Sequence, residues 1–186
     1  MNAQKYTQKS LEAIQAAQSL AVENSNQQIE QQHLALALAD NAEGLIPQLL
    51  KKIGIEPGGF VSALEASVSK LPKVSGVRES GKIYVNADVD RVLNDSEKLA
   101  ASMKDDFVSV EHVFMAILDS PNSEMKRIFG DVGLKKDDFL KALAAVRGSK
   151  RVTSDDPEKT YDALKKYGTD LVERARLQKQ IGRAHV

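Results

Sequence analysis

Apolar side chains recur at helical spacing near the beginning of the chain. Thr7 is a candidate N-cap, because its hydroxyl can accept a hydrogen bond from a backbone N–H of the first helical turn. One buried helical face is then indicated by four apolar residues: Ile14, Ala17, Leu20 and Ala21. A polar stretch over residues 23–28 ends this first predicted helix.

Three more helices are predicted after the polar stretch. Residues 30–39 are strongly apolar, so this helix should be buried at the centre of its unit. Residues 45–52 form a third helix that stops at Gly54, since glycine readily adopts the positive φ of a helix terminus. The fourth helix, residues 60–71, begins after Pro57-Gly58-Gly59 and ends before Pro72.

The same pattern occurs a second time. Shifting the sequence by 79 positions aligns residues 6–68 with residues 85–147 without a gap, and ten of the 63 pairs are identical, among them His33 with His112. Most other apolar positions of the first copy also meet apolar positions of the second. The second copy has Asn86 and Ser109 as candidate N-caps, Pro121 at the start of its third helix and Gly133 after it. The chain is therefore predicted to be all-α, with two copies of one four-helix unit and negligible strand content.

Two segments lack this periodicity and are interpreted as linkers. Residues 73–85 join the two copies, and residues 148–157 follow the second copy. Asp156 and Pro157 then suit the N-cap and first position of a final helix that ends near Arg176.

Composition excludes several classes of protein. The chain has 26 basic and 26 acidic residues, and residues 1–147 alone carry 17 basic against 20 acidic ones, so no bulk charge favours nucleic acid. It has no cysteine, which excludes disulfides and suits a reducing cytoplasm. No apolar run reaches the roughly 18 residues that span a bilayer, so we expect no membrane partner.

Two segments are similar to parts of a nucleotide-binding site. Residues 76–83, GVRESGKI, satisfy the first seven positions of the phosphate-binding loop G-x-x-x-x-G-K-[ST], but Ile83 stands where Ser or Thr would hold Mg²⁺. Residues 113–119, VFMAILD, could be a strand that ends in a magnesium-binding Asp, but the matching HLALALAD at 33–40 is rich in helix-forming Ala and Leu. We expect a linker and a buried helix, and no cofactor bound to this chain.

The aligned histidines are the other candidates for chemistry. His33 and His112 have Glu30 and Glu111 nearby, but a zinc site needs a third and usually a fourth ligand. We expect each histidine to be hydrogen-bonded at the start of its central helix, and we expect neither a metal site nor catalytic residues.

Five segments resemble the amino-terminal domain of the Clp ATPases, most closely the disaggregase branch of that family. They are YTQKSLEAIQAAQSLA at 6–21, QIEQQHLALAL at 28–38, KLPKVSG at 70–76, DFVSVEHVFMAIL at 106–118 and YDALKKYGTDLVERA at 161–175. The last is the most specific, because it is similar to the stretch that leads into the first AAA+ ATPase module. The resemblance implies one globular domain built from a pseudo-twofold pair of four-helix repeats over residues 1–147, a linker over 148–157, and the first helix of a truncated AAA+ module over 158–176.

The resemblance also implies a function. The parent protein would be a cytoplasmic homohexameric ATPase, with ATP and Mg²⁺ as cofactors, that works with the DnaK chaperone system to disaggregate and refold stress-denatured proteins. This chain would bind unfolded or aggregated polypeptide, would not hydrolyse ATP and would be monomeric. The chain departs from the family after Arg176, and residues 180–186 look like translated sequencing-adapter DNA, so residues 177–186 are expected to be a non-native tail.

A groove between the two repeats is expected to bind the polypeptide. The candidate rim residues are Thr7, Asp105 and Glu111, and the candidate apolar contacts are Val89 and Leu93. Replacing either acid with Ala should then weaken binding of an unfolded client and leave the melting temperature nearly unchanged.

Two other functions stay open at this point. One is an N-domain that docks adaptors for a protease-partner Clp ATPase, and the other is a free-standing helical scaffold without a motor.

Overall fold

The computed structural model describes residues 1–75 and 83–157, which form eight α-helices, a short 3-10 helix and a pair of two-residue strands. The bounds of the first repeat are α1 Gln8–Glu23, β1 Gln28–Ile29, α2 Gln31–Ala39, α3 Leu45–Ile53 and α4 Pro57–Ser69. Those of the second are β2 Tyr84–Val85, α5 Ala87–Ser102, α6 Val110–Asp119, α7 Ser123–Val132 and α8 Lys136–Arg147, and the 3-10 helix is Ala3–Lys5. The prediction of an all-α fold built from two four-helix repeats is confirmed.

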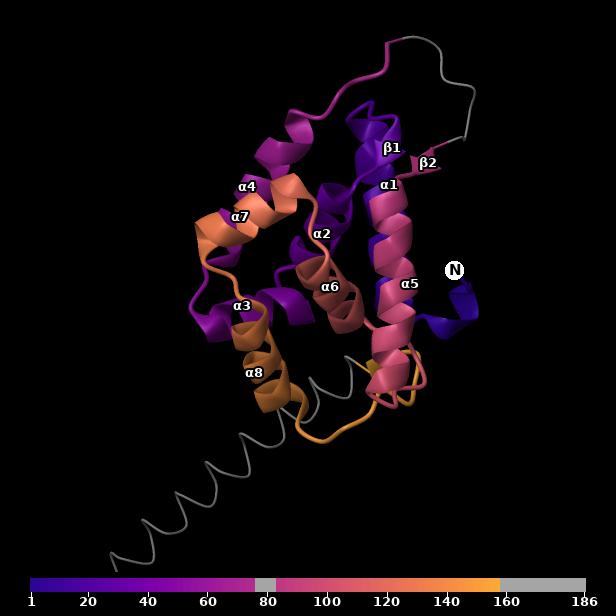
Figure 1. The fold of residues 1–186 in the computed structure, drawn as a ribbon, viewed down its shortest axis with the longest axis vertical. Coiled ribbons are helices and arrows are strands. Elements are labelled where there is room, and N and C mark those ends of the chain that lie inside the picture. Colours follow the sequence, from indigo (N-terminus) through magenta and orange to yellow (C-terminus); the bar gives the residue numbers. More distant parts are fainter. Residues whose placement is uncertain (76–82, 158–186) are drawn as a thin grey trace, which may run out of the picture.

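The two repeats interlock around a pseudo-twofold axis. In Figure 1, α1 and α5 lie on one side of the domain, α2 and α6 lie in the middle, and α3, α4, α7 and α8 lie on the other side. Helix α3 packs on α8, and α7 packs on α4, so each third helix contacts the fourth helix of the other repeat. The central helices α2 and α6 also contact each other. Each repeat therefore completes the core of the other, and the domain is a single unit.

Short parallel pairings connect the repeats in the same exchanged way. Strand β1 pairs with β2, and Ile29 lies opposite Val85. An isolated parallel bridge joins Tyr6 to Val108, and these two residues are the aligned counterparts of Val85 and Ile29. The segment before the first helix of each repeat thus pairs with the segment before the central helix of the other.

Four phenylalanines at the junction of α4, α6, α7 and α8 illustrate the shared core. The ring of Phe114 lies 5.1 Å from that of Phe139, 6.1 Å from that of Phe129 and 6.2 Å from that of Phe60, measured between centroids. Three of the four are completely buried, and Phe129 is 6% exposed. Edge-to-face and tilted aromatic pairs at these distances stabilise a core beyond simple area burial.

Several predicted helix ends are confirmed. The side chains of Thr7 and Asn86 accept hydrogen bonds from backbone N–H groups in the first turns of α1 and α5. Gly54 and Gly133 end α3 and α7 with φ of +95° and +73°, a region that disfavours residues with a Cβ.

Two predicted helix starts are wrong. Helix α4 begins at Pro57 instead of residue 60 and ends at Ser69. Proline suits the first position of a helix, because the N–H group that it lacks would have no hydrogen-bond acceptor within the helix. Helix α7 begins at Ser123 and excludes Pro121, because the Asn122 side chain accepts a hydrogen bond from Met125 N at 2.9 Å and fixes the start there.

The VFMAILD segment lies in α6, as expected, and its terminal Asp119 is exposed. The segment that resembles a phosphate-binding loop falls almost entirely on residues 76–82. The helix predicted for residues 158–176 and the tail fall on 158–186. Both stretches lie outside the described residues.

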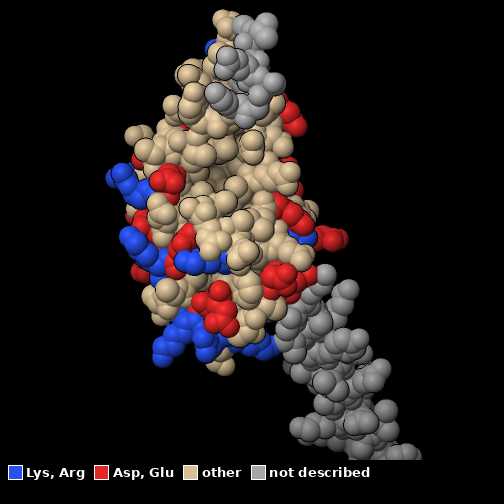
Figure 2. All heavy atoms as spheres, turned by 90° about the vertical axis from the view of Figure 1, so that its right-hand side faces the viewer, with Lys and Arg blue, Asp and Glu red and all other residues tan. Residues whose placement is uncertain are grey.

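In the described part, no helix has the length and apolarity needed to cross a membrane. Basic and acidic side chains lie intermixed on the face in Figure 2.

Candidate functional site

His33 anchors the loop that enters α2. Its Nδ1 accepts a hydrogen bond from Glu30 N at 2.9 Å, so the proton resides on Nε2, which donates to Asn26 Oδ1 at 2.9 Å. The ring is completely buried, and this burial lowers the pKa of His33 to about 4. The structural role predicted for this histidine is confirmed.

His112 does the same at α6, with a charged partner in place of an amide. Its Nδ1 accepts from Ser109 N at 2.9 Å, and its Nε2 lies 2.8 Å from Asp105 Oδ2. Asp105 and Asn26 are aligned positions of the two repeats, so the partner of the histidine is a carboxylate in the second repeat and an amide in the first.

Asp105 is the centre of this buried cluster. Its Oδ1 accepts hydrogen bonds from Val152 N at 2.8 Å and from Arg147 Nη2. Burial opposes ionisation of the carboxyl group, but the hydrogen bonds from Arg147, Val152 and His112 outweigh burial and lower the pKa of Asp105. The carboxylate of Glu111 is also buried and lies 3.9 Å from Arg147 Nη1. The cluster joins α6, the end of α8 and the segment after it.

The predicted rim and contact residues lie in the interior. Thr7 and Glu111 are completely buried, Val89 is 3%, Leu93 6% and Asp105 9% exposed. The exposed rim expected for them is therefore wrong. Thr7 caps α1, Val89 and Leu93 pack into the core, and the two acids face the Arg147 guanidinium. A contribution of these five residues to polypeptide binding stays a prediction, and burial makes any such contribution indirect.

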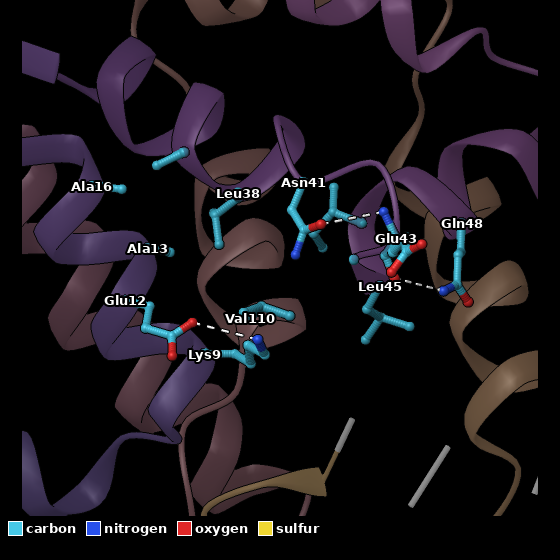
Figure 3. Close-up of a pocket in the computed structure, with 13 residues that line it drawn as sticks. Lys9, Glu12, Ala13, Ala16, Leu38, Asn41, Glu43, Leu45, Gln48 and Val110 are labelled. Carbon is cyan, nitrogen blue, oxygen red and sulfur yellow. Dashed lines mark hydrogen bonds and ion pairs between the residues drawn. The ribbon is translucent and has the colours of Figure 1, made fainter. Parts of the chain in front are cut away.

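A groove in the first repeat is open to solvent, although the apolar residues Leu38, Leu45 and Val110 that line it are themselves only 5–8% exposed. It lies between α1, α2 and α3 and has a volume of about 360 Å³. In Figure 3, Ala13 and Ala16 approach it from α1, Leu38 and Val110 lie between the walls, and Leu45 approaches it from α3. The remaining lining residues are Lys9, Glu12, Ala37, Asn41, Glu43, Gly44, Ile46 and Gln48. We call this hollow the α1–α3 groove.

The floor of the α1–α3 groove is apolar and its rim is polar. Along the rim, Lys9 Nζ lies 3.5 Å from Glu12 Oε2, and Gln48 Nε2 donates to Glu43 O at 3.0 Å. The small side chain of Ala16 leaves the space over α1 open. Apolar floors with polar edges are typical of sites that hold peptide side chains.

A second hollow, with a volume of about 480 Å³, extends the groove along α1. It shares Ala16, Ala37 and Asn41 with the groove and adds Ser19, Leu20, Glu23 and Asp40. Over both hollows the acidic side chains outnumber the single basic one, Lys9. The combined surface can therefore accept an extended segment of several residues with an apolar side and a polar or basic side.

The repeats differ at the wall of this groove. Val110 lines it, and the aligned residue of the first repeat is Gln31. Gln31 Nε2 donates to Ser120 O at 2.9 Å and its Oε1 accepts from Asn122 N at 2.7 Å, so its side chain holds the α6–α7 loop against α2. Valine cannot form either bond, and the loop between α2 and α3 is not held in this way. Sequence reasoning did not identify the groove, although the Gln31/Val110 mismatch is visible in the alignment of the repeats.

Within residues 1–75 and 83–157, no group of three or more His, Cys, Asp or Glu side chains is arranged to hold a metal ion.

Comparison with known proteins identifies the family. Residues 5–132 match the Clp repeat (R) N-terminal domain. The chaperone protein ClpB of Nitratidesulfovibrio vulgaris is 44% identical over 98% of this chain and 22% of its own length, and ClpB of Bacillus cereus is 38% identical over 96% and 21%. The chain thus spans about a fifth of the curated relatives that it matches.

Solved structures show the same fold. The Hsp104 N-terminal domain from Candida albicans superposes with a TM-score of 0.73 at 24% identity, covering 82% of this chain and 97% of that one. A ClpV N-domain in complex with a VipB peptide superposes with a TM-score of 0.57 at 18% identity, covering 75% and 85%. Together with the match to the domain and the two ClpB relatives, this establishes that the chain belongs to the Clp repeat N-terminal domain family.

Proposed function

We propose that this chain is the polypeptide-binding N-terminal domain of a ClpB-type chaperone. The observation that carries the proposal is the α1–α3 groove, a hollow that is open to solvent and combines an apolar floor with polar edges. Unfolded clients share exposed apolar side chains and no common sequence, and such a surface can accept many of them. The relatives at 44% and 38% identity are ClpB chaperones, and the ClpV N-domain complex shows that a domain of this fold can bind a peptide.

The proposal includes the rest of the parent chaperone. An ATP- and Mg²⁺-dependent hexameric motor, cooperation with DnaK, disaggregation of stress-denatured proteins and a cytoplasmic location all rest on the resemblance to ClpB. The chain alone is expected to be a monomer that binds no nucleotide. Light scattering that gave the mass of a hexamer for this chain would contradict that expectation.

The groove can be tested by filling it. Ala16 is exposed and lines both hollows, so Ala16→Arg places a long side chain across the floor without disturbing the core. Gln15→Arg is the matched control. It adds the same charge to α1, and Gln15 is also exposed but lines neither hollow. Fluorescence anisotropy with labelled, reduced and carboxymethylated α-lactalbumin measures binding of a permanently unfolded chain.

We expect Ala16→Arg to weaken this binding by about tenfold or more, the equivalent of about 1.4 kcal/mol, and Gln15→Arg to leave it unchanged. Both variants should melt within a degree or two of the original chain, because exposed substitutions usually change stability by less than about 0.5 kcal/mol. Equal affinity of Ala16→Arg and Gln15→Arg would show that the groove is not the binding site.

A further inference from the structure

The segment after α8, predicted to be a plain linker, folds back along the domain. Gly148 ends α8 with a φ of +61°, and Arg147 Nε donates to Lys150 O at 2.8 Å in the turn that follows. Val152 is then completely buried, whereas residues 153–155 are exposed. We call residues 150–155 the exit strap.

Hydrogen bonds hold the exit strap at two places. Next to the loop before α6, Asp106 N donates to Val152 O at 2.8 Å, and Val152 N donates to Asp105 Oδ1 at 2.8 Å. At the start of α1, Gln8 N donates to Asp155 O at 2.8 Å, and Gln8 Nε2 donates to Asp155 Oδ2 at 3.2 Å. The strap therefore links the end of the second repeat to the beginning of the first.

The contact with Gln8 concerns the groove-lining helix. The N–H of Gln8 is the first of α1, and such groups have no acceptor within their own helix. Asp155 O supplies that acceptor. Lys9 and Glu12, which line the α1–α3 groove, lie in the same first turns of α1.

The first repeat has a related contact, which indicates that the docking site is part of the repeat. After α4 the chain also returns to the loop between its first two helices, where Asn26 Nδ2 donates to Pro72 O at 3.2 Å and Val74 N donates to Ser25 O at 2.8 Å. In the second repeat Asp105 replaces this Asn26, and its charge is matched by Arg147. The docking site on the second repeat is thus the charged version of the same arrangement.

We propose that the Asp105 cluster and Gln8 form a docking site for the exit strap of this same chain, and that the strap can be released from it. In the parent chaperone proposed above, on which this part of the inference rests, docking or release of the strap would set where the domain pivots relative to the motor. When the strap is docked, the chain moves with the domain as far as Pro157, which is also buried. Release of the strap together with Pro157 frees residues 148–157, and at about 3.3–3.6 Å per residue this stretch spans at most roughly 33–36 Å. Release is local, because Val152 and Pro157 are the only buried residues of 148–157, and elements with few buried contacts open without global unfolding.

Amide hydrogen exchange measured by NMR on the full chain tests this proposal. The amides of Gln8, Asp106 and Val152 report docking directly, because each donates to the strap or from it. Docking predicts that all three exchange at least about tenfold more slowly than in an unfolded chain. Val152→Ser should bring the three rates close to the unfolded values, while amides inside α6 stay protected. Thr153→Ser, at the exposed neighbour, should change nothing.

A second variant covers the case in which Val152→Ser unfolds the domain. Gln8→Pro removes the N–H that Asp155 O accepts, and proline is well tolerated at the first position of a helix. We expect faster exchange at Asp106 and Val152 and faster tryptic cleavage after Lys150. Exchange at unfolded rates in the original chain would overturn the proposal, and so would unchanged exchange in the variants. Polypeptide binding is not a readout here, so the two proposals can fail separately.

Discussion

Acid should destabilise this domain through one buried histidine. The pKa of His33 falls from 6.5 to about 4 because the ring is buried with a neutral amide as its partner. In the unfolded chain the imidazole accepts a proton below about pH 6.5, whereas in the folded chain it stays neutral until about pH 4. The unfolded state therefore binds more protons between these values, and stability falls as the pH falls through this window.

The size of the effect follows from the two pKa values. With a pKa of 6.5 in the unfolded chain and about 4 in the folded chain, His33 lowers the free energy of unfolding by about 2 kcal/mol between pH 7 and pH 5. That is a large fraction of the roughly 5–15 kcal/mol by which domains are usually stable.

His33→Gln is the variant that isolates this contribution. Glutamine does not titrate, and at the third helical position its side chain can still accept the hydrogen bond from the backbone N–H of Glu30, as in a capping box. Urea unfolding followed by far-UV circular dichroism at pH 7, 6 and 5 gives the free energy of unfolding of both chains. We expect the original chain to lose about 2 kcal/mol more than His33→Gln between pH 7 and pH 5. Parallel pH dependences of the two chains would refute the reasoning.

Three other predictions concern stability. Gly54→Ala should lower the free energy of unfolding by about 1 kcal/mol, because φ is +95° there. Gly59→Ala inside α4, where an added Cβ meets no atom, should leave this free energy unchanged or raise it by up to about 1 kcal/mol. Thermal melts of the two variants measure the difference. Phe114→Ala should cost about 3–5 kcal/mol in urea unfolding, since it empties the centre of the aromatic cluster, and a loss below 1 kcal/mol would contradict that packing. Asp105→Ala should cost about 3–5 kcal/mol, because it removes the carboxylate that is hydrogen-bonded to the buried Arg147 guanidinium and leaves only Glu111, at 3.9 Å, as its acidic neighbour. The exposed Asp106→Ala should cost less than about 0.5 kcal/mol. This reverses the sequence-based expectation that Asp105→Ala would hardly change the melting temperature.

The repeat and most helix ends could be predicted because they depend on short stretches of sequence. Helical spacing of apolar residues is complete within a few turns, and a cap such as Thr7 or Gly54 acts on the turn next to it. Where two local signals competed, as at Pro57 and Pro121, the helix start was misplaced by two or three residues.

Burial of the polar residues could not be predicted in the same way. Asp105 looks like a loop acid in the sequence, but it is buried because Arg147, 42 residues further on, and Val152, 47 residues further on, meet it in space. The groove likewise needs three helices of one repeat and Val110 of the other. The alignment of the repeats carried a signal for both, since the two copies differ at Asn26/Asp105 and at Gln31/Val110.

The duplicated all-α architecture, the central position of α2 and α6 and the structural role of the paired histidines could thus be predicted from the sequence. The buried charged groups, the open groove and the contacts of the segment after α8 with Gln8 and Asp105 emerged from the folded structure alone. Helix periodicity and capping act between neighbours in the chain, whereas burial and polar pairing depend on contacts between distant residues, such as Gln8 with Asp155, 147 residues apart.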